Sequence, residues 1–359
     1  MLRLSQNLLK GIHRIKGIVT APHPTKIRRL NFAVTYRCNS RCIMCSIWRK
    51  HSDEATWADQ ELNVDQICHL FDKSRYLRNL EEINLTGGEP FLRKDFRKLY
   101  RYFRRAFPRT FIIITTNGLS TKQIWIEDKR DIFWTILLFS LDGLQETNDS
   151  VRGIKGSYNR VTEAIDYYKS HYPCLKMGLS FTILPENYHD LRKVYNLSTQ
   201  LNLSFTMRFA SNSETFYGNS KMRFHWKDPD LCQAESDVQS IAREMARSRN
   251  VLNRLWNPDL FFFSQMVPYQ REKRRFVHCY SGLHSLFLDP YGNVFPCIFS
   301  NRSFGNIAQE SFDDIWVSKV AKEQRLSISK EECHCWTECE TIPSLQRSLK
   351  YFKYKEGSQ

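Results

Sequence analysis

Three cysteines lie within one short segment, Cys38-Asn-Ser-Arg-Cys42-Ile-Met-Cys45. Three thiolates with this spacing can bind three irons of a [4Fe–4S] cluster, and the fourth iron then stays open to another ligand. A small chelating group with an amine and a carboxylate could occupy that open iron. A structural zinc site needs four protein ligands, so zinc is the alternative if His51 supplies the fourth.

A second motif, Thr86-Gly87-Gly88-Glu89-Pro90, follows the next predicted strand. Two glycines allow a ligand to approach the backbone closely, and Glu89 offers a carboxylate to an ammonium group. An ordinary turn would explain the two glycines if the cysteine loop were absent. In a parallel α/β fold, both motifs lie at the carboxyl ends of adjacent strands, where binding sites form.

A second group of cysteines lies near the end of the chain and contains Cys279, Cys297, Cys333, Cys335 and Cys339. The turn sequence at 289–293 separates two strand-like segments and should bring Cys279 and Cys297 together. Clustered cysteines without an export signal favour metal or cluster ligands over disulfides. A zinc knuckle that includes His334 is the alternative. The isolated Cys68, Cys174 and Cys232 are expected to be core thiols.

Strand-like and helix-like segments alternate between these motifs. The predicted strands are Leu30–Thr35, Glu82–Thr86, Phe111–Thr116, Phe133–Ser140, Lys176–Leu184 and Leu203–Phe209. The predicted helices are Val64–Lys73 with Asn63 as its N-cap, Asp95–Ala106, Tyr158–Lys169 and Tyr188–Leu201. This alternation predicts an α/β fold with a parallel sheet and right-handed crossovers, either an open doubly wound sheet or a barrel.

The chain has 359 residues, 42% of them hydrophobic, and a formal net charge of +15. This composition excludes a disordered chain, because a core can be buried. No apolar run approaches the ~20 residues that span a bilayer, and no secretory signal is evident, so we expect a cytoplasmic protein. The basic, weakly amphipathic segment 1–29 predicts either a peripheral contact with the inner membrane surface or a helix packed on the barrel.

The cysteine loop followed by Gly-Gly-Glu-Pro resembles the radical S-adenosylmethionine (radical SAM) superfamily. The resemblance covers about residues 30–215 and implies a partial (β/α)6 TIM-like barrel. It further implies that S-adenosylmethionine chelates the open iron of a [4Fe–4S] cluster held by Cys38, Cys42 and Cys45. One electron would then cleave the sulfonium to methionine and a 5′-deoxyadenosyl radical. The residues it implies for cofactor binding are Met44, Gly87, Gly88, Glu89, Asn117, Ser140, Arg152, Thr182 and Asn187.

Within that pattern, Glu89 would orient the amino group, Arg152 the carboxylate and Ser140 the ribose of S-adenosylmethionine, with Thr182 and Asn187 on the adenine side. Asp142, beside Ser140, is otherwise a turn or helix-cap residue. Met44 stands where the family often has an aromatic residue, and its thioether can also pack on a ring.

The second cysteine group resembles the SPASM/twitch extension of radical SAM enzymes, which begins with a cysteine, a Gly-x4-Cys and a later Cys-x3-Cys. Five cysteines favour the shorter form, with one auxiliary [4Fe–4S] cluster. Cys279, Cys297 and Cys339 are the expected ligands, and the fourth is Cys335 or Cys333, with Cys335 preferred. The expected organisation is a basic segment at 1–29, the barrel at 30–215, a helical linker at 216–275, the auxiliary-cluster domain at 276–345 and a basic tail at 346–359.

These patterns together predict a radical SAM enzyme that abstracts hydrogen from a peptide or from an anionic glycan or lipid-linked metabolite. Its electron donor would be a protein such as flavodoxin or ferredoxin. Nucleic acid is disfavoured as a partner, because no RNA-binding signature is present. No general acid or base can be assigned among the histidines. The alternative function is a non-catalytic, metal-stabilised basic module that binds nucleic acid or an anionic membrane, but it leaves Gly-Gly-Glu-Pro unexplained.

Overall fold

The structure is a computed structural model that describes residues 27–51, 60–120, 126, 128–247, 258–330 and 335–345. The predictions made for segment 1–26, Cys333, His334 and tail 346–359 concern residues outside this described part. The environment of the His51 side chain lies outside it too.

One mixed sheet runs through the molecule. Its strands are β1 (Arg29–Thr35), β2 (Glu82–Gly87), β3 (Phe111–Thr116), β4 (Thr135–Ser140), β5 (Lys176–Ile183), β6 (Ser204–Phe209), β7 (Ser285–Leu288), β8 (Asn293–Phe295) and β9 (Gly305–Asn306). They are ordered β6-β5-β4-β3-β2-β1-β7-β8-β9. The neighbours from β6 to β7 are parallel, and β8 and β9 add as antiparallel strands. Among the described strands, β6 pairs with β5 alone and does not close onto β1, so the parallel strands β1 to β6 form a partly open barrel, as the resemblance implied.

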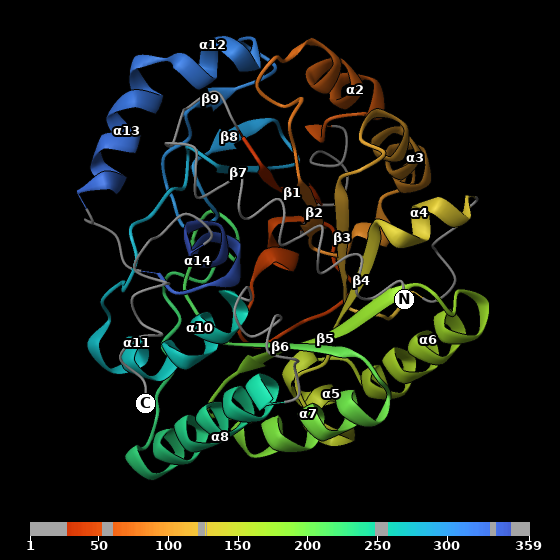
Figure 1. The fold of residues 1–359 in the computed structure, drawn as a ribbon, viewed down its shortest axis with the longest axis vertical. Coiled ribbons are helices and arrows are strands. Elements are labelled where there is room, and N and C mark those ends of the chain that lie inside the picture. The colour runs from red at the N-terminus through yellow and green to blue at the C-terminus, as the bar shows by residue number, and fades with distance from the viewer. Residues whose placement is uncertain are drawn as a thin grey trace.

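Helices cover the outer side of this curved sheet (Figure 1). They are α2 (Val64–Lys73), α3 (Phe96–Ala106), α4 (Lys129–Phe133), α5 (Gln145–Arg152), α6 (Ser157–His171), α7 (Leu191–Gln200) and α8 (Asp228–Arg247). The later helices are α10 (Pro258–Ser264), α11 (Met266–Glu272), α12 (Phe312–Val317), α13 (Lys319–Ser329) and α14 (Glu338–Leu345). Short 3-10 turns are η1 (Ile47–His51), η3 (Pro90–Leu92) and η4 (Tyr188–Asp190). None of the helices in the described ranges is long and apolar enough to cross a membrane.

The apolar periodicity of the sequence explains this arrangement. Six of the seven residues of β1 are buried, because β1 lies between β2 and β7 with both faces covered. Helix α3 presents an apolar face to the sheet, and its Phe103 ring meets Phe32 of β1 edge-on at 6.5 Å between centroids. Asn63 caps α2 in a full capping box with Gln66, as its position predicted.

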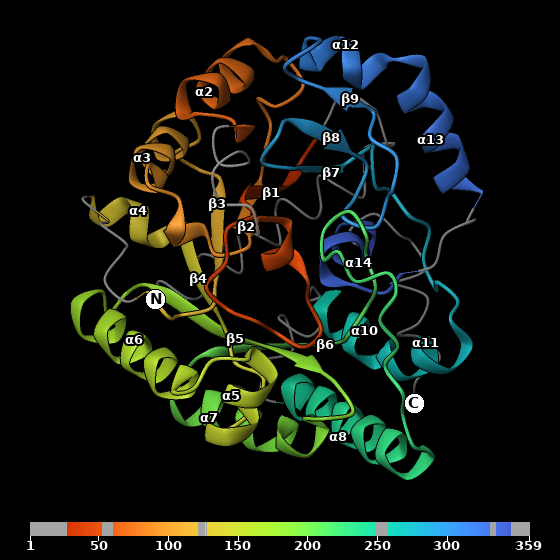
Figure 2. The same ribbon diagram turned by 180° about the vertical axis from the view of Figure 1, so that it is seen from behind.

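The C-terminal elements continue the sheet beyond β1. Figure 2 shows β7, β8 and β9 beside β1, with α12 and α13 next to them. The predicted hairpin is present between β7 and β8, where Asp289 accepts hydrogen bonds from the backbone N–H groups of Tyr291 and Asn293. One predicted boundary is wrong: Phe133 belongs to α4, because Asp128 caps a short helix before β4 begins at Thr135.

Two of the isolated cysteines also differ from expectation. Cys174 and Cys232 are exposed, and Cys68 is only half-buried. Cys232 lies on α8 among positions that face away from the buried stripe of that helix, which explains its exposure.

Candidate active site

The three cysteines of the first group line a cavity at the carboxyl ends of the parallel strands. Most of the residues predicted to bind the cofactor line the same cavity, namely Met44, Gly87, Gly88, Asn117, Ser140, Arg152 and Thr182. The remaining two, Glu89 and Asn187, are completely buried behind its wall. The topology thus brings residues from the ends of six strands to one place.

The cysteine loop follows β1 and is held in shape by its neighbours. The backbone N–H groups of Arg41 and Ile43 donate to the carbonyl oxygens of Arg152 and Val151, both at 2.9 Å. These carbonyls lie at the C-terminal end of α5. Gly153 ends that helix at a φ of 65°, and a Cβ there would lie 2.4 Å from the Arg41 carbonyl oxygen. The loop is therefore fixed by backbone contacts and not by the cysteines alone.

Nitrogen groups point toward two of the three sulfur atoms. The backbone N–H of Ser40 donates to Cys38 Sγ at 3.4 Å, and Arg152 Nη1 lies 3.7 Å from Cys42 Sγ. Burial raises the pKa of Cys38 and of Cys45 to about 12. The two donors suit the thiolates that bind a cluster, because ligand cysteines are deprotonated when a metal binds.

The two glycines after β2 have a structural reason that the sequence did not reveal. A Cβ on Gly88 would lie 2.1 Å from the carbonyl oxygen of Arg37, and one on Gly87 would lie 2.1 Å from that of Thr35. The Gly88 and Glu89 N–H groups donate to these same two oxygens, Thr35 at 2.9 Å and Arg37 at 2.7 Å. The Gly-Gly segment is therefore packed against the backbone that leads into the cysteine loop.

Glu89 anchors the next strand end. Its carboxylate accepts hydrogen bonds from the Asn117 N–H at 2.7 Å, the Thr116 hydroxyl at 2.9 Å and the Phe91 N–H at 3.1 Å. Complete burial raises the pKa of Glu89 to about 7, against the effect of these hydrogen bonds. The Asn117 amide in turn donates to Ser40 Oγ at 3.0 Å. Glu89 thus supports the cysteine loop through Asn117, and its predicted contact with S-adenosylmethionine stays a prediction.

Arg152 has a fixed ionic partner. Its Nη2 lies 2.5 Å from Asp142 Oδ2, and the carboxyl group of Asp142 is inaccessible to solvent. Asp142 also accepts a hydrogen bond from the Thr182 N–H at 2.7 Å, while Asn187 Nδ2 donates to the Asp142 carbonyl oxygen at 2.8 Å. Asp142 is therefore neither a simple turn nor a cap residue. It joins the ends of β4 and β5 to the arginine that faces Cys42.

The C-terminal domain closes one side of this cavity. Arg208 of β6 lines it and pairs with Glu338 of α14 at 3.1 Å, while Cys339 lines the cavity directly. Tyr217 lines it too, and burial raises the pKa of its phenol to about 12. One predicted ligand of the auxiliary cluster thus adjoins the cavity that holds the first cysteine group.

The second cysteine group is assembled from distant segments. Cys279, Cys297 and Cys335 are buried, and Cys339 is half-buried. The thiol of Cys279 donates to Ser281 Oγ at 3.2 Å, and Arg275 Nη1 donates to Cys335 Sγ at 2.8 Å. Burial raises the pKa of Cys297 well above its usual value, with further contributions from the charges of Glu340, Cys335 and Cys279. Cys279, Cys297 and Cys335 therefore lie close enough to interact in a buried environment, while the charges that act on Cys339 include those of Arg29 and Arg208.

The residues present fit iron–sulfur clusters at both places. Near the second group, Glu340 Oε1 and Thr337 Oγ1 are buried without a hydrogen-bond partner among the described residues, as expected where a further group belongs. Within the described ranges, no three His, Cys, Asp or Glu side chains converge closely enough for a single metal ion. The ligands of a cluster lie farther apart, because each binds a different iron.

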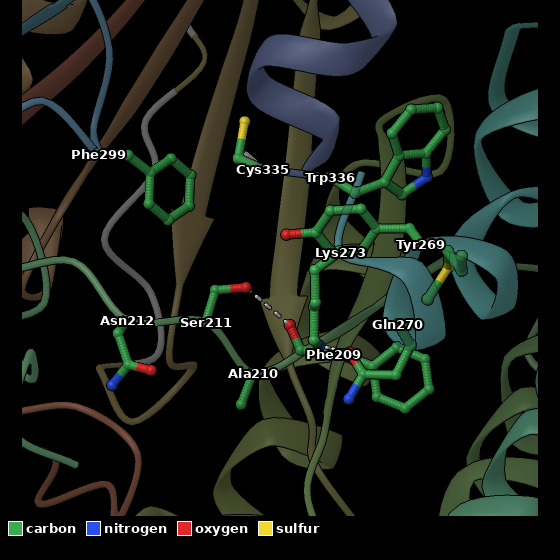
Figure 3. Close-up of a pocket in the computed structure, with 11 residues that line it drawn as sticks. Phe209, Ala210, Ser211, Asn212, Tyr269, Gln270, Lys273, Phe299, Cys335 and Trp336 are labelled. Atoms are coloured by element: carbon green, nitrogen blue, oxygen red, sulfur yellow. Dashed lines mark hydrogen bonds between the residues drawn. The ribbon is translucent and has the colours of Figure 1, made fainter. Parts of the chain in front are cut away.

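A second cavity adjoins the first and was not foreseen from the sequence. Phe209, Ala210 and Ser211, at the end of β6, line both cavities. Figure 3 shows these residues facing Tyr269 and Lys273 of the α11 region, with Cys335 and Trp336 above them. The sequence predicted only a helical linker here, because the segments that form this cavity lie far apart along the chain.

Comparison with known proteins supports the assignment that these features suggest. The family model of the radical SAM superfamily matches residues 32–198, and the model of an iron–sulfur cluster-binding domain, SPASM, matches residues 279–340. The structure of SuiB from Streptococcus suis bound to S-adenosylmethionine has the same fold, with a TM-score of 0.58 and 14% identity. It covers 89% of this chain, which in turn covers 72% of that structure.

Two curated relatives share part of their length with this chain. Fe-coproporphyrin III synthase of Methanosarcina barkeri (strain Fusaro / DSM 804) is 29% identical over 46% of this chain, and the match spans 39% of that protein. The antilisterial bacteriocin subtilosin biosynthesis protein AlbA of Bacillus subtilis (strain 168) is 24% identical over 80% of this chain, and the match spans 59% of that protein. Residues 32–198 of this chain therefore form a domain of the radical SAM superfamily and residues 279–340 a SPASM domain, and the cofactors of these domains are S-adenosylmethionine, a [4Fe–4S] cluster and an auxiliary iron–sulfur cluster.

Proposed function

We propose that this chain cleaves S-adenosylmethionine reductively and uses the resulting radical to abstract hydrogen from a substrate in the barrel cavity. The observation that carries the proposal is the position of Cys38, Cys42 and Cys45. They line one cavity together with most of the predicted cofactor-binding residues at the strand ends. When bound, the reduced cluster and S-adenosylmethionine supply a 5′-deoxyadenosyl radical.

The residues of the chain have separable roles in this proposal. Cys38, Cys42 and Cys45 hold the cluster, and Arg152 places a positive charge beside Cys42. Glu89, fully buried, fixes the strand end that carries Asn117. An external one-electron donor, such as flavodoxin or ferredoxin, supplies the electron.

The auxiliary cluster is proposed to be a single [4Fe–4S] cluster held by Cys279, Cys297 and Cys339, with Cys335 preferred to Cys333 as the fourth ligand. Cys335 is buried and accepts a hydrogen bond from Arg275, which is typical of a thiolate position. The position of Cys339 in the lining of the barrel cavity supports a role for the auxiliary cluster in exchanging an electron with the substrate.

A peptide is the first candidate substrate. AlbA takes part in the biosynthesis of a bacteriocin, and SuiB has been solved with the precursor peptide SuiA, in a structure with a TM-score of 0.59 to this chain. A tetrapyrrole is the second candidate, because Fe-coproporphyrin III synthase is among the relatives.

The test is the release of 5′-deoxyadenosine from S-adenosylmethionine by anaerobically purified, reduced protein. The wild type should release it, and the triple variant C38A/C42A/C45A should not. A wild-type protein that contains zinc and releases no 5′-deoxyadenosine would instead support the non-catalytic module.

A further inference from the structure

The second cavity has a volume of about 180 Å³. For comparison, an engineered apolar cavity of about 150 Å³ in another protein binds benzene. The cavity is therefore large enough for one ring-sized group. Because Phe209, Ala210 and Ser211 line both cavities, a molecule held in the barrel cavity can extend across them into the second one.

Two residues that line the second cavity, Tyr269 and Trp336, belong to a stack of aromatic rings that continues behind them to Phe262. Tyr269 lies nearly parallel to Trp336, with 6.1 Å between ring centroids, and Trp336 lies parallel to Phe262 at 5.9 Å. The Trp336 indole N–H donates to the Phe262 carbonyl oxygen at 2.9 Å, which fixes the indole ring. Phe299 stands on the opposite side of the cavity (Figure 3). These rings offer a preformed apolar surface to a ring or an aliphatic chain.

Lys273 supplies the charge of this cavity. Its Nζ lies 5.6 Å from the centroid of the Tyr269 ring and donates to Gln270 Oε1 at 2.8 Å. Among the described residues, no aspartate or glutamate lines either cavity, whereas Arg152, Arg208 and Lys273 do. Because Arg152 and Arg208 pair with Asp142 and Glu338, Lys273 is the cation of this lining that we assign to an anion.

The backbone fixes where the Lys273 side chain begins. Lys273 ends α11 in the left-handed region, with a φ of 51°. Glycine is the usual residue at such a position, and a residue with a Cβ is strained there by about 1–2 kcal/mol. Such strain persists where the surrounding structure fixes the conformation. The amino group is the feature that lysine adds to this cavity.

We propose that the second cavity binds a ring-sized, carboxylate-bearing group of the substrate, with the carboxylate paired to Lys273 and the ring packed on Tyr269. That this group belongs to the substrate rests on the proposed function, but its binding in the second cavity does not require turnover. The carboxylate can come from a peptide or from a non-peptide acid, and both sources present the same chemistry to Lys273.

The test uses matched small probes and the cluster-loaded protein saturated with S-adenosylmethionine. 3-Phenylpropionate is compared with 3-phenylpropanamide, which has the same shape without the charge, by ligand-observed NMR titration. The wild type should bind the acid at least tenfold more tightly. Lys273→Gln should abolish the preference, Lys273→Arg should retain it, and Lys322→Gln, at an exposed position on α13, should leave it unchanged.

Equal binding of the two probes by the wild type would overturn the proposal. So would a preference that survives in Lys273→Gln, because the acid would then bind elsewhere, for example at Arg208. N-Acetylphenylalanine differs from 3-phenylpropionate by its acetamido group and distinguishes the sources: tighter binding indicates a peptide terminus, and weaker binding a non-peptide acid.

Release of 5′-deoxyadenosine without substrate is measured on the same samples. It should be unchanged in Lys322→Gln, because Lys322 is exposed on α13 and lines neither cavity. If the wild type released none, the proposed function would fail, and the probe titration would still decide whether the second cavity binds the acid.

Discussion

The two cysteine groups are built in opposite ways. The first lies on one loop, which the C-terminal end of α5 holds through the Arg152 and Val151 carbonyl oxygens. The second takes Cys279 from before β7, Cys297 from after β8 and Cys339 from α14. The barrel therefore forms the first site largely without its cluster. The second site depends on the packing of several short elements, to whose folding a cluster contributes directly.

The largest expected effect is on activity, in the first group. Cys45→Ala should reduce 5′-deoxyadenosine release to background, because the cluster loses one of three ligands. Its melting temperature should stay close to that of the wild type, since backbone hydrogen bonds hold the loop. Cys68→Ala, which alters a half-buried cysteine outside both groups, is the control for thiol loss. A large fall in melting temperature for Cys45→Ala would show that the loop is not preformed.

Substitution of a cysteine in the second group should mainly lower the stability of the fold. Cys297→Ala removes a buried, proposed ligand where the C-terminal elements meet, and we expect a loss on the order of 4 kcal/mol in the free energy of unfolding. The iron content should fall by the amount of one cluster. Thermal unfolding and iron analysis of Cys297→Ala and Cys45→Ala measure the difference in stability between the two groups. Equal destabilisation by the two substitutions would remove the distinction between the groups.

A smaller effect is expected from Arg152, which supports the first group without being a ligand. The substitution Arg152→Lys keeps the positive charge, but a lysine ammonium could not contact Asp142 and Cys42 in the same way as the guanidinium. Changes to such supporting residues typically cost about 10- to 100-fold in metal affinity or activity. The initial rate of 5′-deoxyadenosine release should fall by that amount, with iron content retained. An unchanged rate would show that the contacts of Arg152 with Asp142 and Cys42 have a structural role only.

The smallest expected effect is a pH dependence of stability from Glu89. Its pKa is about 7 in the fold and 4.5 in an ordinary glutamate, so between these values the folded protein holds a proton that the unfolded chain has lost. Stability should therefore fall as the pH rises from 4.5 to 7 and change no further above it. Glu89→Gln should lack this component, which melting temperatures of both proteins, measured at intervals from about pH 5 to about pH 8, would show. Parallel curves for the two proteins would contradict the assignment.

The sequence was informative where the determinants are local. The Cys38, Cys42 and Cys45 spacing, the six strand segments and the Asn63 cap all depend on residues near one another. The cap is found as predicted, and the strand ends lie within one residue of the prediction except at Phe133. The contacts that support the site were missed because they join distant segments. Gly88 meets the carbonyl oxygen of Arg37, and Arg152 is shared between Asp142 and Cys42.

The second cavity shows the same limit more strongly. Its walls come from the end of β6, from α11 and from the segment before α14, and none of these carries a motif. The one local signal was a lysine at the end of a helix, where glycine is usual. Without the fold, that signal cannot be distinguished from an ordinary exposed lysine.

The most direct test of the central claim is electron paramagnetic resonance of the reduced protein with and without S-adenosylmethionine. We predict that S-adenosylmethionine changes the signal of one cluster, that this signal is absent from C38A/C42A/C45A, and that the signal of the auxiliary cluster remains in that variant. A spectrum that does not respond to S-adenosylmethionine, or a responsive signal that survives in the triple variant, would contradict the account.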